Sequence, residues 1–165
     1  RAGEDRNAIG GWDKNWARGK DGILLLHPPG DLKYYRQKTL GKVIVVGRKT
    51  LESFPGGKPL PDRTNIVLTS DAAYEAPGCI ICHSKDEVME TIAGYDPEDV
   101  FIAGGSQIYE QFMEDCDGFY VTKIYDEFEA DRYFPDLDAA GYKVIWESEM
   151  QQEKGIAYRF LKYSR

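Results

Sequence analysis

The feature that most constrains the fold of this chain is a run of four apolar residues, Val43-Ile44-Val45-Val46, that ends at Gly47. A short, continuously β-branched run is typical of a strand that is buried on both faces of a parallel sheet. Arg48, Lys49 and Thr50 follow the glycine. We expect these residues to open a short helix whose free N–H groups and positive end face an anion.

The same arrangement recurs later in the chain. A second apolar run, Val100-Phe101-Ile102-Ala103, meets Gly104 and Gly105 at the start of a helical pattern. Two consecutive glycines permit close approach of the backbone to a ligand. Two such strand-to-helix turns indicate a ligand with two phosphate-bearing ends. The spacing is not G-x-G-x-x-G, so the ordinary dinucleotide-binding fingerprint is absent.

Composition excludes several classes of protein. The formal net charge of −7 disfavours binding of nucleic acid through a broad basic face. No apolar run approaches the ~20 residues of a membrane span, so we expect no membrane partner. A chain of 165 residues predicts one domain. We assign that domain to residues 7–165 and set residues 1–6 aside as an N-terminal stub.

The three cysteines are expected to be free. Cys79 and Cys82 have the spacing of a redox pair or half a zinc site, but they lie in a β-rich segment where they fall on opposite faces. We therefore expect buried thiols, no metal site, and a reducing, cytoplasmic compartment.

Strand patterns alternate with helical patterns, which predicts an α/β fold with a mostly parallel sheet. The expected strands are residues 7–12, 42–46, 65–69, 79–82, 100–103 and 118–125. The expected helices are residues 31–39, 84–93 and 106–113, and Ser84 with Glu87 has the capping-box pattern. Two β-rich segments at the end of the chain, residues 142–147 and 157–163, predict an antiparallel hairpin at a sheet edge.

Two charged residues are candidate ligand contacts. Asp31 begins the first helix, so it is either an acid stabilised by the helix dipole or a carboxylate that holds a protonated heterocycle through two hydrogen bonds. Arg63 follows a Pro-Leu-Pro turn, so it is either a surface arginine or a fork for a carboxylate.

Taken in order, these segments resemble the dihydrofolate reductase family from Asn7 to Tyr163. The resemblance rests on Asn15-Trp16-Ala17-x-Gly19, Pro29-x-Asp31-Leu32-Lys33-Tyr34-Tyr35, Gly47-Arg48-Lys49-Thr50-Leu51-Glu52-Ser53, Pro59-Leu60-Pro61-x-Arg63-x-Asn65-Ile66-Val67-Leu68-Thr69, Ile102-Ala103-Gly104-Gly105-x-x-Ile108-Tyr109, Val121-Thr122 and Asp131-x-x-Phe134-Pro135.

The resemblance implies a three-layer fold, in which an eight-stranded, mostly parallel sheet with a C-terminal antiparallel hairpin carries about four helices. It implies a monomeric, NADPH-dependent enzyme that reduces 7,8-dihydrofolate to 5,6,7,8-tetrahydrofolate and binds antifolate inhibitors. The hydride goes to C6 of the pterin, and Asp31 assists protonation of N5.

The resemblance also implies roles for individual residues. Catalytic roles fall to Asp31, to its hydrogen-bonding partner Thr122 and to Leu24, while Arg63 forks onto the substrate's α-carboxylate. The substrate side is expected to comprise Ile9, Asp31, Leu32, Tyr35, Phe54, Leu60, Arg63, Ala103, Tyr109 and Thr122. The NADPH side is expected to comprise Gly11, Arg18, Gly19, Gly47, Arg48, Lys49, Thr50, Leu68, Thr69, Ser70, Gly104, Gly105, Ser106, Gln107, Ile108 and Tyr109.

Departures from the family pattern are concentrated in residues 10–30. Gly10 and Gly11 weaken the first strand, Arg18 stands where a branched aliphatic residue closes over the nicotinamide, and Pro28 and Gly30 reshape the turn before Asp31. Two alternatives therefore stay open. One is a non-catalytic or altered-specificity binding protein on the same scaffold, and the other is a related pterin or pyrimidine reductase.

Overall fold

The computed structural model describes residues 6–13, 17–20, 23–24, 29–125, 132–133 and 136–165, with side chains for residues 6–11, 30–125 and 136–165. Several sequence expectations fall outside the described residues, namely those on Asn15, Trp16, Pro28, Asp131 and Phe134-Pro135. The chain divides into two compact units, Arg1–Ala8 with Thr39–Cys116, and Ile9–Lys38 with Asp117–Arg165. We refer to them as the first and second units.

The first unit is built on parallel strands. Its strands follow the order β1-β7-β4-β5-β6, and each neighbouring pair in this order is parallel. Their bounds are β1 Arg6–Asp13, β4 Val43–Gly47, β5 Thr64–Leu68, β6 Cys79–Cys82 and β7 Val100–Gly104. The apolar runs that predict buried strands form β4 and β7, which are neighbours in the order, with Val46 opposite Gly104.

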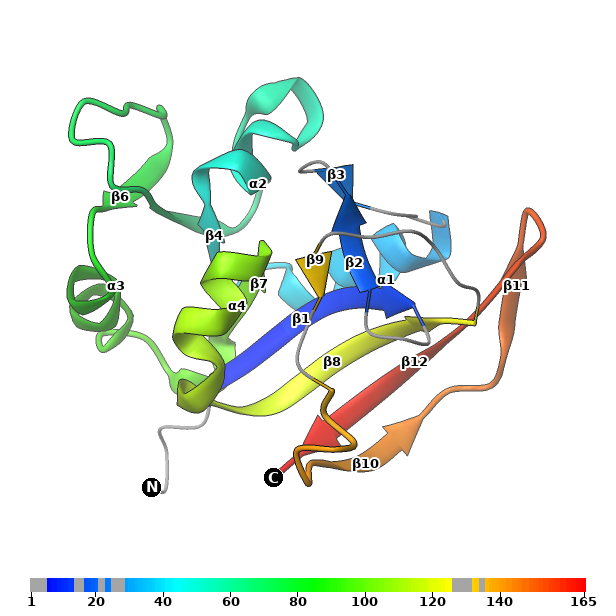
Figure 1. The fold of residues 1–165 in the computed structure, drawn as a ribbon. Helices are drawn as coiled ribbons and strands as arrows, with labels where there is room; N and C mark the ends of the chain where they lie inside the picture. The colour runs from blue at the N-terminus through cyan, green and yellow to red at the C-terminus, as the bar shows by residue number, and fades with distance from the viewer. Residues whose placement is uncertain (1–5, 14–16, 21–22, 25–28, 126–131, 134–135) are drawn as a thin grey trace. The chain divides into compact units, whose positions relative to one another are not determined.

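Short helices connect these strands. They are α2 (Arg48–Glu52), α3 (Lys85–Ile92) and α4 (Ser106–Phe112), with single 3₁₀ turns at Pro55–Gly57, Pro97–Asp99 and Met113–Asp115. In Figure 1, α4 lies alongside β7, against which it packs. The start of α3 confirms half of the predicted capping box, because the Glu87 backbone N–H donates to Ser84 Oγ. The Glu87 carboxylate accepts instead from the His83 N–H.

The second unit contains α1 (Pro29–Thr39, to Lys38 in this unit) and antiparallel strands. Its strand order is β10-β12-β8-β1, with β12 antiparallel to β8, β10 and β11. The bounds are β8 Cys116–Ile124, β10 Lys143–Glu147, β11 Gln151–Glu153 and β12 Ile156–Ser164. A small separate sheet has the order β3-β2-β9, from Ile23–Leu24, Ala17–Lys20 and Arg132–Tyr133.

The predicted fold class is confirmed. Strand β1 contributes residues to both units, the first of which has parallel ladders and the second antiparallel ones. All six strands and three helices expected from the sequence form within a few residues of their predicted bounds, as does the C-terminal hairpin of β10 and β12. The sequence did not predict β11 or the small sheet.

Leu32, expected on the substrate side, is 54% exposed. One side-chain expectation differs from the structure. Cys79 is half-buried rather than buried, since it begins the edge strand β6, whereas Cys82 and Cys116 are buried. All three thiols are free.

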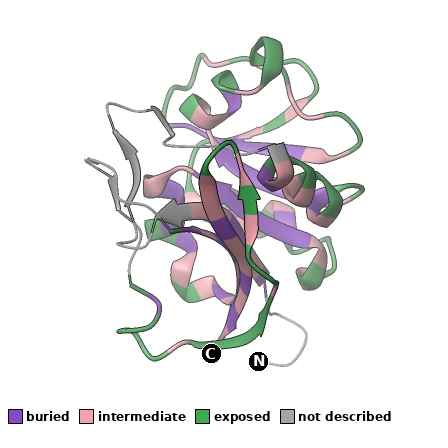
Figure 2. Ribbon diagram, turned by 90° about the vertical axis from the view of Figure 1, so that its right-hand side faces the viewer, coloured by how far each residue is buried: buried purple, intermediate pink, exposed green. Residues whose placement is uncertain are grey.

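Buried residues lie mainly along β4, β5, β7 and β8, whereas β10 is exposed over its whole length, and exposed residues fill the loops and outer helix faces (Figure 2). In the first unit the largest fully buried side chains include Tyr109 and Phe112, and in the second they include Phe119, Tyr158 and Tyr163. Full burial of one large apolar side chain contributes about 1.5–3 kcal/mol, so these rings account for much of the cohesion of each unit. Among the described helices, none has both the length and the apolar character needed to cross a membrane.

Candidate active site

Asp31 lies in the first turn of α1 and is only 8% exposed. Thr122, buried on β8, donates a hydrogen bond from its hydroxyl to Asp31 Oδ1 at 2.6 Å. A carboxylate is favoured at this end of a helix because the backbone N–H groups there carry a partial positive charge. The structure therefore brings the two expected partners together and holds one carboxylate oxygen in place.

Gly11, on β1, lies beside the same carboxylate. A methyl group added at Gly11 would lie 3.7 Å from Asp31 Oδ2 and 3.6 Å from the Thr122 carbonyl oxygen. The sequence places Gly11 on the cofactor side, and that role stays a prediction. The structure adds that the missing side chain leaves room next to the acid.

A second carboxylate reaches the start of α1. The backbone N–H of Gly30 donates to Glu153 Oε1 at 2.9 Å, and the Tyr158 hydroxyl donates to the same oxygen. Burial raises the pKa of Tyr158 to about 12, helped by the hydrogen bond to Glu153 and by the charges of Glu153 and Asp31. Neither Glu153 nor Tyr158 was predicted. Only the three-dimensional fold brings residue 153 to residue 30, so no local pattern in the sequence signals the contact.

An aromatic stack supports α1 one turn further on. The Tyr34 ring lies 3.9 Å from the Phe160 ring, centroid to centroid, with an angle of 9° between the planes. Burial raises the pKa of Tyr34 to about 12, with smaller contributions from Tyr120 and Asp31. Among the described residues, the buried Tyr34 hydroxyl has no hydrogen-bond partner.

The two glycine turns of the first unit meet. A methyl group added at Gly47 would lie 3.2 Å from Ile108 Cγ1 of α4, and one added at Gly105 would lie 3.5 Å from Thr50 Oγ1 of α2. The Gly104–Gly105 peptide bond is cis. Gly47 and Gly105 are the N-caps of α2 and α4, and neither helix start receives a side-chain cap.

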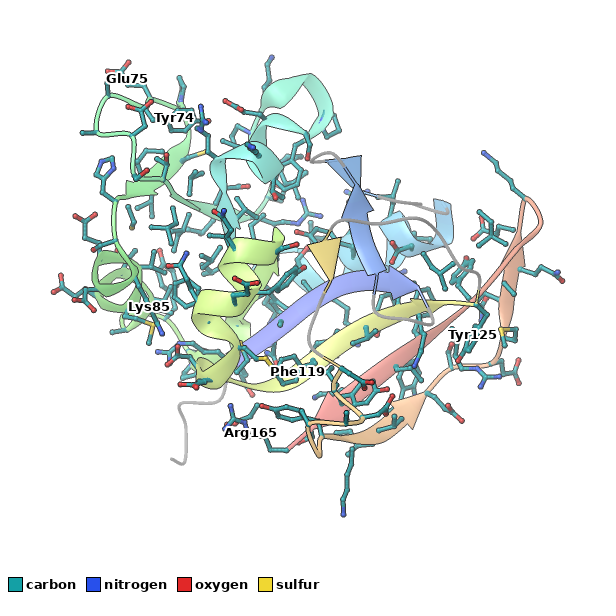
Figure 3. All side chains as sticks on the ribbon, in the orientation of Figure 1. Tyr74, Glu75, Lys85, Phe119, Tyr125 and Arg165 are labelled. Carbon is teal, nitrogen blue, oxygen red and sulfur yellow. The ribbon has the colours of Figure 1, made fainter. Side chains whose placement is uncertain are left out.

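This arrangement fits phosphate groups. Uncapped N–H groups at a helix start bind anions, and glycine caps let an anion approach the backbone closely. Arg48 and Lys49 begin α2 beside these turns. The Arg48 guanidinium also lies 6.0 Å from the centroid of the Tyr74 ring, labelled in Figure 3.

The other expected cofactor contacts lie at the ends of β5 and in α4. Leu68 and Thr69 are buried and Ser70 is exposed; the Thr69 hydroxyl accepts from the Asp71 N–H at 3.2 Å. In α4, Ile108 and Tyr109 are buried, Ser106 is half-buried and Gln107 is exposed. Only the exposed or half-buried residues of these two groups have side chains open to a ligand, so Leu68, Thr69, Ile108 and Tyr109 would contribute chiefly through backbone or packing.

Arg63 is held by its own unit. Its Nε donates to Thr39 Oγ1 and its Nη1 donates to the Pro61 carbonyl, each at 2.8 Å. The buried Asn65 side chain fixes the turn, since it accepts from the Leu60 N–H at 3.0 Å and donates to the Leu60 carbonyl at 2.9 Å. No role is predicted for Asn65 from the sequence, although an asparagine inside an apolar strand is a signal that its amide has local partners.

The remaining predicted residues differ in burial. Ile9 and Ala103 are buried, and Tyr35, Phe54 and Leu60 are half-buried. The side chains of Leu24 and Arg18 lie outside those described, and Gly19 is placed only as part of β2. The described residues contain no group of three or more His, Cys, Asp or Glu side chains arranged to hold a metal ion.

Comparison with known proteins identifies the family of this chain. The family model described as "Dihydrofolate reductase" matches residues 7–165. This chain belongs to the dihydrofolate reductase family. A dihydrofolate reductase of Bacillus subtilis (strain 168) is 41% identical over 155 residues, which are 93% of this chain and 90% of that protein. A type A13 dihydrofolate reductase of Escherichia coli is 36% identical over 137 residues, 83% of this chain and 80% of that protein.

A solved structure of the family is similar over nearly the whole chain. Dihydrofolate reductase from Enterococcus faecalis, complexed with NADP(H) and RAB-propyl, superposes with a TM-score of 0.87 at 33% identity. The match covers 99% of this chain and 97% of that one. The resemblance to dihydrofolate reductase expected from the sequence is therefore confirmed.

Proposed function

We propose that this protein is a dihydrofolate reductase that converts 7,8-dihydrofolate into 5,6,7,8-tetrahydrofolate. The observation that carries the proposal is the buried Asp31 carboxylate, held by Thr122 at the start of α1. Family membership supports the same reaction.

The Asp31 carboxylate has the chemistry that a pterin requires. A carboxylate accepts two parallel hydrogen bonds, here from the pterin amino group and an adjacent ring N–H. The Thr122 hydroxyl donates to Oδ1, which fixes the orientation of the carboxylate plane before substrate binds. With the pterin held in this way, Asp31 favours protonation of N5 as the ring is reduced.

NADPH, when bound, supplies the hydride that reduces C6. The uncapped starts of α2 and α4 are suited to its phosphates, with Arg48 and Lys49 adjacent. Arg63, anchored by Thr39 and Pro61, is suited to the α-carboxylate of the folate tail. A substrate without a carboxylate tail has no use for this arginine, which disfavours a pterin or pyrimidine reductase of another specificity.

A non-catalytic binding protein is the second candidate function. The observation that favours it is the missing side chain at Gly11, which leaves room beside Asp31, together with the glycine at position 10. In this case folate analogues would bind without turnover. We further propose a monomeric protein of the cytoplasm, which is consistent with three free thiols.

The test is loss of NADPH absorbance with dihydrofolate, run beside a fluorescence titration with methotrexate. Turnover supports the reductase. Tight methotrexate binding without turnover supports the binding protein. Absence of both overturns the assignment of Asp31 and Arg63 to a folate site.

Asp31→Asn provides the sharpest check on the mechanism. The amide keeps the size of the side chain but removes the charge and one acceptor, so turnover at neutral pH should fall ~100-fold or more, the scale for loss of an acid–base group. NADPH affinity, measured by fluorescence, should hardly change. Asp86→Asn, at an exposed position of α3, is the matched control. Equal loss of NADPH binding in Asp31→Asn would assign Asp31 a structural role.

A further inference from the structure

Glu153 is a long-range cap on the helix that carries Asp31. It is the last residue of β11, yet its Oε1 accepts the Gly30 N–H of α1 at 2.9 Å. The first N–H groups of a helix have no carbonyl acceptor in the helix itself. Pro29 has no N–H to offer, so Gly30 presents the first backbone donor of α1. Glu153 therefore supplies both an acceptor and a negative charge at the positive end of α1.

Gly30 is matched to this contact. A methyl group added at Gly30 would overlap both Glu153 Oε1 and the Tyr158 hydroxyl. The Gly30 backbone is not in the left-handed region, since its φ is not positive. Glycine is needed there for space, because the cap from β11 occupies the volume that a side chain would fill.

Tyr158 holds the cap in place. Its hydroxyl donates to Glu153, and the residue is only 2% exposed, so its ring has little room to move. Burial, the hydrogen bond to Glu153 and the charges of Glu153 and Asp31 raise the pKa of this hydroxyl, so it stays protonated and remains a donor. The Tyr158 ring also packs edge-on against Phe160, at 5.6 Å between centroids, and Phe160 stacks on Tyr34 of α1.

We propose that Glu153 is a positioning residue for the reduction, acting through the Gly30 N–H and the Tyr158 hydroxyl to fix the first turn of α1 and so the direction of the Asp31 carboxylate. This inference rests on the function proposed above. The hairpin of β11 and β12 then holds α1 at two points, the Glu153 cap and the Phe160 stack. Asp31 follows Gly30 directly, so a shift of the first turn moves the carboxylate.

The first experiment compares Glu153→Ala with Glu153→Gln. Alanine removes the acceptor, and misplacement of a reacting group lowers a rate by up to ~100-fold, so we expect the single-turnover rate of hydride transfer to fall roughly tenfold. Glutamine keeps an oxygen that accepts both hydrogen bonds, so it should restore most of that rate. The KM for NADPH should be unchanged in both variants. Glu149→Ala, at an exposed glutamate between β10 and β11, is the control and should behave as wild type.

The second experiment uses Gly30→Ala. Its methyl group would overlap both Glu153 Oε1 and the buried Tyr158 hydroxyl, so its rate loss should be at least that of Glu153→Ala. Because the Glu153 contact is already broken in Gly30→Ala, adding Glu153→Ala should lower the rate little further. Losses that add fully would show that Gly30 and Glu153 act separately, which overturns the inference.

Methotrexate affinity separates failure of this inference from failure of the proposed function. If the wild-type protein does not reduce dihydrofolate, the proposed function fails, and the methotrexate Kd still reports the placement of Asp31. Roughly tenfold weaker binding to Glu153→Ala, with rescue in Glu153→Gln, supports the inference. Unchanged rate and unchanged Kd in folded Glu153→Ala, with only a lower Tm, would make Glu153 structural and overturn it.

Discussion

At the residue scale, Gly11 and Gly41 are glycines for different reasons. Gly41 has φ of +76°, where a side chain strains the backbone, although nothing lies within 4 Å of an added Cβ. Gly11 has no positive φ, and an added Cβ meets only ordinary contacts with Asp31 and Thr122. The conformation of the chain thus requires glycine at Gly41 but not at Gly11.

We therefore expect Gly11→Ala to raise the free energy of unfolding by about 0.4–1 kcal/mol, because alanine reduces the conformational freedom of the unfolded chain. Gly41→Ala should lower it by about 1 kcal/mol or more. Urea unfolding followed by circular dichroism measures both. A destabilised Gly11→Ala would mean that β1 cannot accept a side chain beside Asp31.

Residues of the candidate site were predictable where their chemistry is carried by a local pattern. Asp31 follows Pro-Pro-Gly at a helix start, and Gly104-Gly105 follow an apolar strand, so both can be recognised from the sequence alone. Glu153 does not, because its partner lies 123 positions away and only the fold brings the two together. Asn65 is intermediate: its polarity inside an apolar strand is visible, but its contact with Leu60 depends on the turn.

At the scale of the element, α3 has the clearest start in the chain. Ser84 has extended backbone and accepts the Glu87 N–H, as an N-cap does. We expect Ser84→Ala to lower the free energy of unfolding by about 1 kcal/mol, since it removes that acceptor. Ser84→Asp should restore the loss, because aspartate caps as well as serine. Thermal unfolding measures both, and an unchanged Ser84→Ala would show that packing of Val88 and Ile92 alone holds α3.

Elements also differ in how far their sequence specifies them. β4 and β7 are continuous apolar runs and form as expected, since burial on both faces demands that pattern. β11 is only Gln-Gln-Glu, with no apolar alternation, and it exists because Lys154 and Gly155 turn the chain back onto β12. Both turn residues have positive φ, 50° and 78°, as a two-residue hairpin requires. A lysine at the first position of the turn, Lys154, does not by itself predict such a turn from the sequence.

At the scale of the whole molecule, alternation of strands and helices predicted the class of the fold, but not the order of its strands. The order β1-β7-β4-β5-β6 brings Gly47 beside Ile108 and Gly105 beside Thr50, so that two turns about 57 residues apart in the chain meet. The sequence showed two similar turns. Their meeting is a property of strand order, which depends on contacts spread over the sheet rather than on any local segment.

Alkaline pH should destabilise the molecule through its buried tyrosines. The pKa of Tyr34 and of Tyr158 is raised to about 12 from the ordinary 10.0, chiefly by burial. The pKa of Tyr163 is raised further, by burial first and then by its hydrogen bond to Asp138 at 2.9 Å. Below pH 10 these phenols are protonated in both states. As the pH rises from about 10 towards 12, the unfolded chain loses these protons and the folded chain keeps them, so stability falls.

The free energy of unfolding in urea, measured at intervals across that window, should therefore decline steeply above pH 10. Tyr163→Phe removes one titrating group. The slope of the free energy of unfolding against pH should therefore become less negative by about the contribution of one bound proton. Tyr95→Phe, at an exposed position, is the matched control and should leave the slope as it is in the wild type. If Tyr163→Phe declines as steeply as the wild type, Tyr163 titrates alike in the folded and unfolded chains, and burial of its hydroxyl against Asp138 contributes nothing to the alkaline limit of the fold.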